Sequence, residues 1–200
     1  MATPAADWDA AYQEGAPAPW DIGRPQPAFV RLADAGLLRG RVLDAGCGTG
    51  ENTLLAAARG ADAVGVDISA LAIEQARGKA AARGLAARFE VGDVLSLGER
   101  GATFDTVIDS GVFHVFDDAD RARYVASLAS ALRSGGTCYL MCFTDREPGT
   151  WGPRRVRDDE LRDAFRHGWS VTSITADTFD LTPGFGAGVA QAWLATIVRR

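Results

Sequence analysis

The stretch RVLDAGCGTGENTLL, residues 41–55, decides the fold that this chain is expected to adopt. Its residues 42–43 predict a short buried strand closed by Asp44, and the residues from Asn52 onward predict a helix. Between them lies a GxGxG turn made by Gly46, Gly48 and Gly50. Glycine suits such a turn because it adopts unusual φ values and lets a ligand approach the backbone. The helix start adds free N–H groups and a positive dipole end, which suit a carboxylate or a phosphate.

A glycine-rich turn also occurs as a plain connection between a strand and a helix, so its context matters. A second predicted strand, residues 63–66, ends in Asp67, which lies 21 residues after Gly46. At about this spacing an acidic side chain meets the hydroxyl pair of a ribose in dinucleotide-type folds. The two signals together predict a site for a molecule that contains adenosine.

Length and composition are those of an ordinary globular chain. The 200 residues predict one domain, and contents of 47% hydrophobic and 24% charged residues are usual for it. The net charge of −5 offers no basic footprint for nucleic acid. No stretch approaches the roughly 20 apolar residues of a membrane span, and the first residues lack the order of a signal peptide. We therefore expect a cytoplasmic protein that binds neither nucleic acid nor membrane.

The three cysteines predict neither a disulfide framework nor a metal site. Their number is odd, and Cys47, Cys138 and Cys142 fall in predicted core strands or their turns, which favours a reducing compartment. Cys138 and Cys142 are four residues apart and would share one face of a strand, but no third or fourth metal ligand accompanies them. We expect them to pack in the core, as free cysteines usually do.

Apolar periodicity predicts strands and helices in alternation along the chain. Five more strands are predicted at residues 88–91, 104–108, 137–143, 171–175 and 189–198. Helices are predicted at residues 27–38, 52–59, 119–132 and 158–165, and another follows its N-cap Ser69 and ends near Gly84. Prolines between residues 17 and 27 exclude a helix there and predict an extended arm. Strands that alternate with helices imply parallel pairing, and parallel sheets bind ligands at the carboxyl ends of their strands.

Acidic residues follow four of these predicted strands. They are Asp44, Asp67, Asp93 and Asp109, the last with Ser110 beside it. A desolvated carboxylate needs a partner, and four of them at one edge of a sheet are hard to explain as packing. We expect a shared polar ligand to supply those partners.

The residue after the third glycine bears on which adenosine compound is bound. Nicotinamide dinucleotides are read by GxGxxG, whereas here Glu51 stands where the third glycine or alanine would be. A negatively charged side chain at that position would repel a pyrophosphate. No GxxxxGK[ST] motif of a P-loop is present either. The pattern favours an adenosine ligand without phosphate.

The ordered motifs resemble those of the class I S-adenosylmethionine-dependent methyltransferases over roughly residues 40 to 145. The motifs are VLDAGCGTG, VGVDIS, GDV, FDTVIDSGVFHV and LRSGGTCYLMCF. The resemblance implies a doubly wound, Rossmann-like α/β fold, with a seven-stranded, mostly parallel sheet and an antiparallel strand at the C-terminal end. It implies an N-terminal aromatic and proline-rich lid at residues 1–28 and one methyltransferase domain at residues 29–200.

The N-terminal arm narrows the resemblance. Its WxxxY pattern, followed by PWDIGRPQP, is similar to the arm of the thiopurine and halide/thiol methyltransferases. It is also similar to the arm of bacterial enzymes that methylate heterocyclic toxins and quinolones. In that group the aromatic residues of the arm enclose the cofactor sulfonium and the substrate. Aromatic residues in an arm often only pin it to the core, but a sulfonium cation does favour an aromatic face such as that of Trp20.

The resemblance also implies a role for individual residues. The backbone of Gly46, Cys47 and Gly48 would hold the methionine portion of S-adenosylmethionine. The other cofactor-binding residues would be Asp67 at the ribose, Ile68 on the adenine, Asp93 and Val94 at the adenine edge, Asp109 and Ser110 under the methionyl end, and Trp8, Tyr12 and Trp20 as a cap. No metal is implied. The product would be S-adenosylhomocysteine.

Methyl transfer to a nucleophile is an in-line displacement at a carbon that the sulfonium already activates. Orientation in a dry pocket supplies roughly 7–11 kcal/mol in reactions of this kind, and a base is optional. His114 lies five residues after Asp109 near the expected acceptor side, and its ordinary pKa is near the working pH. A histidine there is as often structural as catalytic. We predict that His114 accepts or orients a proton of a phenol, a hydroxyquinolone or a heterocyclic nitrogen, beside aromatic residues at Phe113, Phe116, Trp151 and Phe185.

Other functions remain open at this point. A halide or thiol acceptor is the nearest alternative, and a nicotinamide-dependent oxidoreductase or a non-catalytic S-adenosylmethionine-binding module belongs to another class. A nucleic-acid methyltransferase disagrees with the net charge. It also disagrees with the sequence of residues 109–112, which lacks the Pro-Pro-aromatic element of base methylases. Either a monomer or a homodimer is compatible with the sequence.

Overall fold

The structure is a computed structural model that describes residues 5–13, 18–185 and 187–200. Its strands are β1 (Arg41–Ala45), β2 (Asp62–Asp67), β3 (Arg88–Val91), β4 (Phe104–Ser110), β5 (Leu132–Phe143), β6 (Trp169–Asp180) and β7 (Val189–Arg199). Its α-helices are α1 (Ala5–Ala11), α2 (Pro27–Asp34), α3 (Glu51–Ala58), α4 (Ala70–Arg83), α5 (Asp118–Ala131) and α6 (Asp158–Ala164). Two 3-10 helices, η1 (Val94–Arg100) and η2 (Phe113–Val115), complete the elements.

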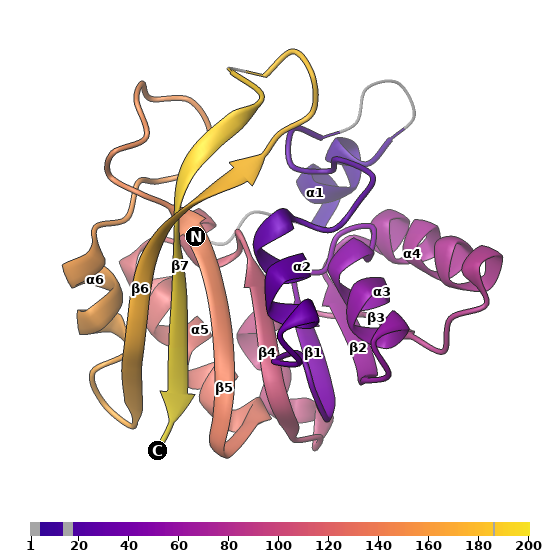
Figure 1. The fold of residues 1–200 in the computed structure, drawn as a ribbon, viewed down its shortest axis with the longest axis horizontal. Coiled ribbons are helices and arrows are strands. Elements are labelled where there is room, and N and C mark those ends of the chain that lie inside the picture. Colours follow the sequence, from indigo (N-terminus) through magenta and orange to yellow (C-terminus); the bar gives the residue numbers. More distant parts are fainter. Residues whose placement is uncertain (1–4, 14–17, 186) are drawn as a thin grey trace.

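The strands form one seven-stranded sheet in the order β3-β2-β1-β4-β5-β7-β6. The pairs from β3 to β5 are parallel, whereas β7 is antiparallel to both β5 and β6. Helices α2 and α3 cover one face of the sheet and α5 covers the other (Figure 1). The predicted α/β class, the seven-stranded sheet and the antiparallel C-terminal strand are confirmed.

Two elements differ from the sequence-based expectation because pairing extends them. β5 starts at Leu132, which pairs with Phe104, and the register then shifts until Thr137 pairs with Thr106. The two glycines at 135–136 therefore lie inside an irregular strand instead of separating a helix from a strand. β6 is more than twice as long as the residues 171–175 that the sequence indicates, because β7 pairs with it along its whole length.

Helix ends follow from local hydrogen bonds. Ser69 caps α4 as predicted, since its hydroxyl accepts the Ala72 N–H at 3.1 Å. α2 ends at Asp34, earlier than the expected residue 38, because the Leu37 N–H folds back to the Leu32 carbonyl at 3.0 Å. These caps satisfy N–H and C=O groups that a helix end otherwise leaves without partners.

The core lies on both faces of the sheet, as expected for parallel strands covered by helices. Leu43 and Leu140 are fully buried on central strands, and burial of such a side chain contributes roughly 1.5–3 kcal/mol. Cys138 and Cys142 are also fully buried in β5, which confirms the prediction that they pack in the core. In the described part of the chain, no helix has the length and apolar character needed to cross a membrane.

Candidate functional site

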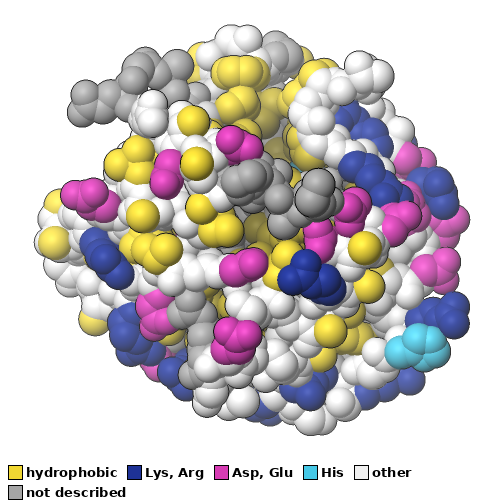
Figure 2. Space-filling model, turned by 180° about the vertical axis from the view of Figure 1, so that it is seen from behind, with side chains coloured by type: hydrophobic (Ala, Val, Ile, Leu, Met, Phe, Trp, Pro, Cys, Tyr) yellow, Lys and Arg dark blue, Asp and Glu magenta, His cyan; other side chains and the backbone are white. Residues whose placement is uncertain are grey.

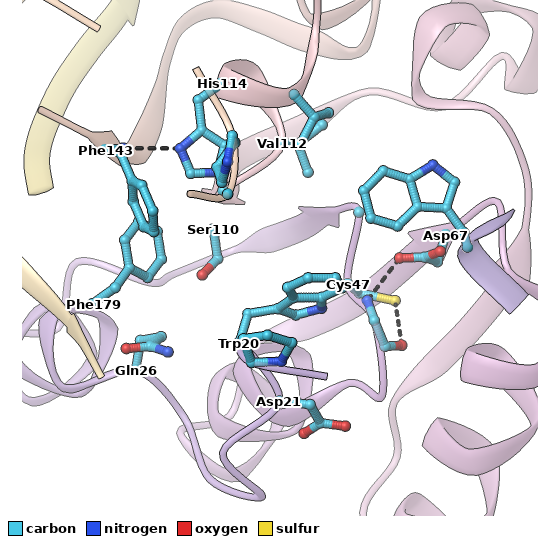
Figure 3. A pocket seen from close by; sticks show the side chains of 18 of the residues that line it. Trp20, Asp21, Gln26, Cys47, Asp67, Ser110, Val112, His114, Phe143 and Phe179 are labelled. Carbon is cyan, nitrogen blue, oxygen red and sulfur yellow. Dashed lines mark hydrogen bonds between the residues drawn. The ribbon is translucent and has the colours of Figure 1, made fainter. Parts of the chain in front are cut away.

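A cavity of about 1000 Å³ lies at the carboxyl ends of the parallel strands. Its walls come from the glycine loop (residues 46–50), the arm (residues 18–26), the turn after β4, the loop after β5 and the tip of the β6–β7 hairpin. Seen from behind, the molecule is hollowed near its top, where hydrophobic side chains gather between charged ones (Figure 2). In a closer view, His114, Phe143 and Phe179 lie on one side of the cavity and Cys47 and Asp67 on the other (Figure 3).

The cavity brings together most of the residues that the sequence singled out for a cofactor. Its lining includes Trp8, Tyr12, Trp20, Gly46, Cys47, Gly48, Asp67, Ile68, Asp93, Val94 and Ser110. These residues are spread over more than a hundred positions of the chain, and the carboxyl edge of the sheet places them side by side. Asp109 does not line the cavity.

The glycine loop turns tightly over the end of β2. The N–H groups of Gly46 and Cys47 both donate to the Val66 carbonyl, at 2.8 and 3.0 Å. Gly46 has φ +68°, and a Cβ added there would lie 2.2 Å from a methyl carbon of Val112. Position 46 therefore requires glycine on both conformational and steric grounds.

The Asp67 carboxylate is held by the backbone at the rim of the cavity. Oδ2 accepts the Gly48 N–H at 2.8 Å, and Oδ1 accepts the Ser69 N–H at 2.9 Å. Burial raises the pKa of Asp67, although both hydrogen bonds act in the opposite direction. An ionised carboxylate has about four acceptor sites, so lone pairs of Asp67 remain for hydroxyl groups of a ligand.

The Asp109 carboxylate has its partners inside the protein. Oδ1 accepts the Val112 N–H at 2.7 Å, and Oδ2 accepts the Phe113 N–H at 3.2 Å and the Tyr124 hydroxyl at 3.1 Å. Complete burial raises the pKa of Asp109 to about 7. The expectation that a ligand partners this carboxylate is therefore wrong. Asp109 instead shapes the turn after β4.

The two remaining acids also differ from each other. Asp44 is fully buried beneath the glycine loop, accepts the Thr53 hydroxyl at 2.7 Å and does not line the cavity. Burial raises its pKa to about 7. Asp93 does line the cavity, and its Oδ1 accepts the Leu95 N–H at 2.8 Å as the N-cap of η1. Of the four strand-end acids, only Asp67 and Asp93 reach the shared cavity.

The aromatic residues of the N-terminal region form a cluster over the glycine loop. The ring of Trp20 meets Trp8 and Tyr12 edge-on, at centroid distances of 5.9 and 6.4 Å. Trp20 Nε1 also donates to the Tyr12 hydroxyl at 3.1 Å. A Cβ added at Gly48 would lie 2.9 Å from that hydroxyl, so Tyr12 sits directly on the loop. The predicted cap thus has its three residues together at the cavity.

Polar contacts that the sequence did not reveal hold this region in place. The Ser69 hydroxyl donates to the Asp9 carboxylate at 2.6 Å, and the Thr49 hydroxyl donates to Asp21 at 2.9 Å. Further along the arm, Gln26 pairs with the backbone of Asp180, donating to its carbonyl at 3.0 Å and accepting its N–H at 2.9 Å. These side chains carry no local sequence signal, since their partners lie 28 to 154 positions away.

His114 is a buried, neutral imidazole. Its Nδ1 accepts the Phe143 N–H at 2.9 Å, and a hydrogen bond to the Gly111 backbone engages the other side of the ring. Burial, together with the positive charges of Arg121 and Arg155, lowers the pKa of His114 to about 3. The lone pair that a general base would use is occupied. Two roles were predicted for His114, to accept a proton of the acceptor or to orient it. This arrangement favours the second.

Aromatic side chains face the glycine loop across the cavity. The aromatic wall consists of His114, Phe143, Trp151, Phe179 and Phe185. The His114 ring lies 4.9 Å from the Phe143 ring, which in turn lies 5.4 Å from that of Trp151 and 5.6 Å from that of Phe179. Phe143 and Phe179 were missed in the sequence because each stands at the end of a strand where a core residue is equally expected.

One residue predicted for the acceptor side does not belong there. Phe113 is fully buried and does not line the cavity. Its ring packs 5.8 Å from that of Phe165, and the Arg121 guanidinium lies 4.6 Å from its centroid. The short η2 turn sends Phe113 into the core and the next residue, His114, toward the cavity. Adjacent positions in a turn point to different sides, which the sequence alone did not resolve.

Glu51, which follows the third glycine of the loop, forms ion pairs with two basic side chains of α4. It opens α3 and pairs with Lys79 at 2.9 Å and with both terminal nitrogens of Arg83 at 2.8 Å. Its pKa is lowered by Arg83 and Lys79 against the effect of burial. A carboxylate thus fills the anion-attracting start of the helix. The expectation of a ligand without phosphate agrees with this arrangement.

Known proteins resemble the chain along nearly its whole length. Residues 42–136 match a family described as "Methyltransferase domain". The "2-heptyl-1-hydroxyquinolin-4(1H)-one methyltransferase" of Mycobacteroides abscessus is 37% identical over 187 residues, covering 92% of this chain and 82% of that protein. The "Probable thiol methyltransferase 2" of Arabidopsis thaliana is 30% identical over 189 residues, covering 93% of this chain and 83% of that protein.

A solved structure has the same fold at a similar level of identity. It comes from work on "Conversion of a Disulfide Bond into a Thioacetal Group during Echinomycin Biosynthesis" and is 38% identical to this chain. The superposition has a TM-score of 0.88 and covers 98% of this chain and 92% of that chain. The likeness therefore includes the N-terminal region and the C-terminal hairpin as well as the central sheet.

Proposed function

Because this chain belongs to the class I S-adenosylmethionine-dependent methyltransferases, we propose that it methylates a small aromatic acceptor. The acceptor is a phenol, a hydroxyquinolone or a heterocycle that is methylated on nitrogen or oxygen. The single observation that supports this choice is the aromatic wall opposite the glycine loop. The hydroxyquinolone methyltransferase relative gives the same class of acceptor independent support.

The residues of the cavity fit S-adenosylmethionine. The free acceptor sites of Asp67 suit the ribose hydroxyls, and Ile68 with Val94 offers apolar contact for the adenine. Gly46, Cys47 and Gly48 line the cavity, and the two glycines present backbone without a side chain there, which suits contact with the methionine portion. Trp8 and Trp20 offer aromatic faces, which a sulfonium cation favours.

The cofactor, when bound, supplies a methyl group that its positive sulfur activates toward a nucleophile. The chain contributes a shaped cavity with aromatic lining and a fixed orientation for the acceptor. Flat aromatic molecules pack well against the edge-on rings of the aromatic wall. Orientation of this kind supplies roughly 7–11 kcal/mol in comparable reactions.

His114 serves to position groups, not to take up a proton, in this proposal. Its Nδ1 lone pair is engaged by the Phe143 N–H, and its pKa is lowered to about 3. The acceptor therefore brings a lone pair of its own, as an ionised hydroxyl or a heterocyclic nitrogen does. Soft nucleophiles such as thiols and halides meet the same condition. The thiol methyltransferase relative makes these acceptors the second candidate.

A donor-consumption assay tests the acceptor. The purified protein is incubated with S-adenosylmethionine and, separately, with phenols, hydroxyquinolones, heterocyclic amines, thiols and iodide, and S-adenosylhomocysteine is measured. Turnover on a flat hydroxylated or nitrogen heterocycle, at a kcat/KM well above that for thiols and iodide, supports the proposal. The reverse order would select the second candidate. Cofactor binding by calorimetry without turnover on any acceptor would contradict both.

We also propose a cytoplasmic location, which the three free thiols support. The acceptor is a small molecule in this proposal, and the acidic net charge disfavours nucleic acid. A monomer and a homodimer both agree with it, and size-exclusion chromatography with light scattering distinguishes them.

A further inference from the structure

The loop that carries Trp151 to the aromatic wall has an unusual internal support. This wall loop, residues 145–155, connects the end of β5 to the start of α6. Its residues Trp151, Gly152, Pro153 and Arg154 line the cavity, but Arg155 does not. We infer that Arg155 is a positioning residue that holds the wall loop in the shape the acceptor meets. That the loop receives an acceptor rests on the proposed function.

The two ends of the wall loop are fixed to the sheet. Thr144 and Val156 form a parallel β-bridge, and the Val156 N–H donates to the Phe143 carbonyl at 2.9 Å. The Val156 carbonyl accepts the indole N–H of Trp193 on β7 at 3.0 Å. The two ends of the wall loop are therefore held beside the sheet, and the segment between them must be ordered in another way.

The guanidinium of Arg155 provides that order by binding the loop backbone. Its N–H groups donate to five carbonyls, those of Glu147, Pro148, Gly149, Trp151 and Pro153. The bonds to Trp151 and Pro153 are 2.7 Å long and the other three are 3.3 Å. A guanidinium has five N–H donors in a planar fork, so the loop uses its whole donor capacity.

The same guanidinium also packs against two rings of the aromatic wall. Its central carbon is 5.4 Å from the ring centroids of both Phe143 and Trp151. These rings meet each other edge-on. Gly152, with φ +70°, turns the chain beside Phe143 where a side chain would be strained. Arg155 thus fixes the position of Trp151 through its carbonyl and through its ring.

The neighbouring Arg154 shows what an ordinary surface arginine does in this loop. It pairs with the carboxylates of Asp118 and Glu160. Within the described residues, no carboxylate lies within ion-pair distance of Arg155. Its hydrogen bonds go to backbone carbonyls instead, so the side chain is committed to the shape of the loop. Lysine, with three donors on a single nitrogen, cannot reproduce this arrangement.

Two variants and one control test the inference. Arg155→Ala removes the support and Arg155→Lys keeps only the charge. Arg146→Ala is the matched control, because Arg146 belongs to the same loop and stacks on Trp193, 4.8 Å from its centroid, away from the cavity. Hydrogen exchange of the peptide spanning residues 146–154 is measured in each. We expect faster exchange in both Arg155 variants, and no change in the glycine loop or in the control.

Kinetics with an accepted substrate supply the second readout. We expect kcat/KM to fall about tenfold to a hundredfold in both Arg155 variants, mainly through the KM for the acceptor, with cofactor affinity unchanged. In the Trp151→Ala background, removal of Arg155 should add little further loss, because both changes remove the same wall. Wild-type behaviour of Arg155→Lys, additive losses, or an equal loss of cofactor affinity would overturn the inference. Failure of the wild type on every acceptor would overturn the proposed function alone, since exchange needs no substrate.

Discussion

The carboxylates at the carboxyl edge of the sheet differ in their hydrogen-bond donors. Asp67 accepts two backbone N–H groups and lines the cavity, so part of its acceptor capacity remains for a ligand. Asp109 accepts three hydrogen bonds from its own protein and does not line the cavity. The position of Asp67 at the cavity was predictable because its partners are the glycine loop and its own helix cap. The role of Asp109 was not, because Tyr124 reaches it from α5 through tertiary packing alone.

Asp67→Asn should weaken S-adenosylmethionine binding. Hydrogen bonds to a charged group are worth roughly 1.5–3 kcal/mol, so we expect an affinity loss of about tenfold to a hundredfold. Isothermal titration calorimetry measures it. Asp62→Asn is the matched control, since Asp62 lies at the other end of β2, half-exposed, and pairs with Arg41 and Arg88. Equal affinities of Asp67→Asn and the wild type would contradict the assignment.

His114 should make the protein sensitive to acid. Its folded pKa of about 3 lies below the ordinary 6.5, so the unfolded chain binds the proton first and stability falls as pH drops from 6.5 toward 3. At pH 5 this costs about 2 kcal/mol of unfolding free energy. Denaturant unfolding at pH 5 and 7.5 measures the difference. His114→Asn, which offers an oxygen to the Phe143 N–H, should lose this part of the pH dependence.

The exposed His167 provides the control for that experiment, and His167→Asn should keep the full acid sensitivity. The same His114→Asn variant tests catalysis. If His114 only positions groups, the pH profile of kcat should keep its shape across pH 6–9 while its height falls. Loss of an acidic limb from that profile would show that His114 does accept a proton.

At the scale of elements, the sequence predicted the central strands and helices but not the irregular elements. Glycines, caps and apolar runs predicted the strands and helices from β1 to α4 to within one or two residues. β6 was underestimated because half of it is polar and is a strand only through pairing with β7. η2 was missed because its three residues carry no repeating pattern, and its direction decides that Phe113 is core and His114 is site.

We propose that the aromatic cap, made of Trp8, Tyr12 and Trp20, is what the N-terminal region contributes to cofactor binding. Trp20 is 43% exposed, yet it is held by Trp8 and Tyr12 at the cavity. A cation over an aromatic face is worth roughly 0.5–2 kcal/mol, so Trp20→Ala should weaken cofactor binding by about threefold to thirtyfold. Stopped-flow dissociation of the cofactor measures it.

Trp151→Ala gives the reciprocal control for Trp20→Ala, because Trp151 stands on the aromatic wall and not at the cap. It should leave the cofactor dissociation rate unchanged and raise the KM for the acceptor. Faster cofactor release in Trp151→Ala, or an unchanged rate in Trp20→Ala, would show that cap and wall are not separate in function.

Considered as a whole, the molecule closes its cavity by joining parts that are distant in sequence. Gln26 does this between the arm and the hairpin: its side-chain amide pairs with both backbone groups of Asp180, as a neighbouring strand would. The Thr182 N–H, also on the hairpin, donates to the Pro19 carbonyl at 2.9 Å. Figure 1 shows α1 and the extended end of this hairpin at the same end of the sheet. Such long-range pairs cannot be read from local sequence.

Gln26→Ala should therefore destabilise the whole fold. It leaves the N–H and C=O of Asp180 without partners, which costs roughly 1–3 kcal/mol for each buried polar group. Urea unfolding measures the loss. Gln191→Ala is the control, since the Gln191 side chain is exposed on β7 and the hydrogen bonds of this residue are made by its backbone. Equal stability of both variants would contradict a joining role for Gln26.

Lys79 is the one lysine in the chain, and it contacts two residues that line the cavity, Glu51 and Thr49. An amine-directed reagent thus finds a single side chain to modify, apart from the chain terminus. Because the Thr49 hydroxyl that Lys79 contacts also holds Asp21 of the arm, the rate of acylation becomes a gauge of whether the arm is seated. A mass spectrum taken over time would then follow the release of the arm without an added probe.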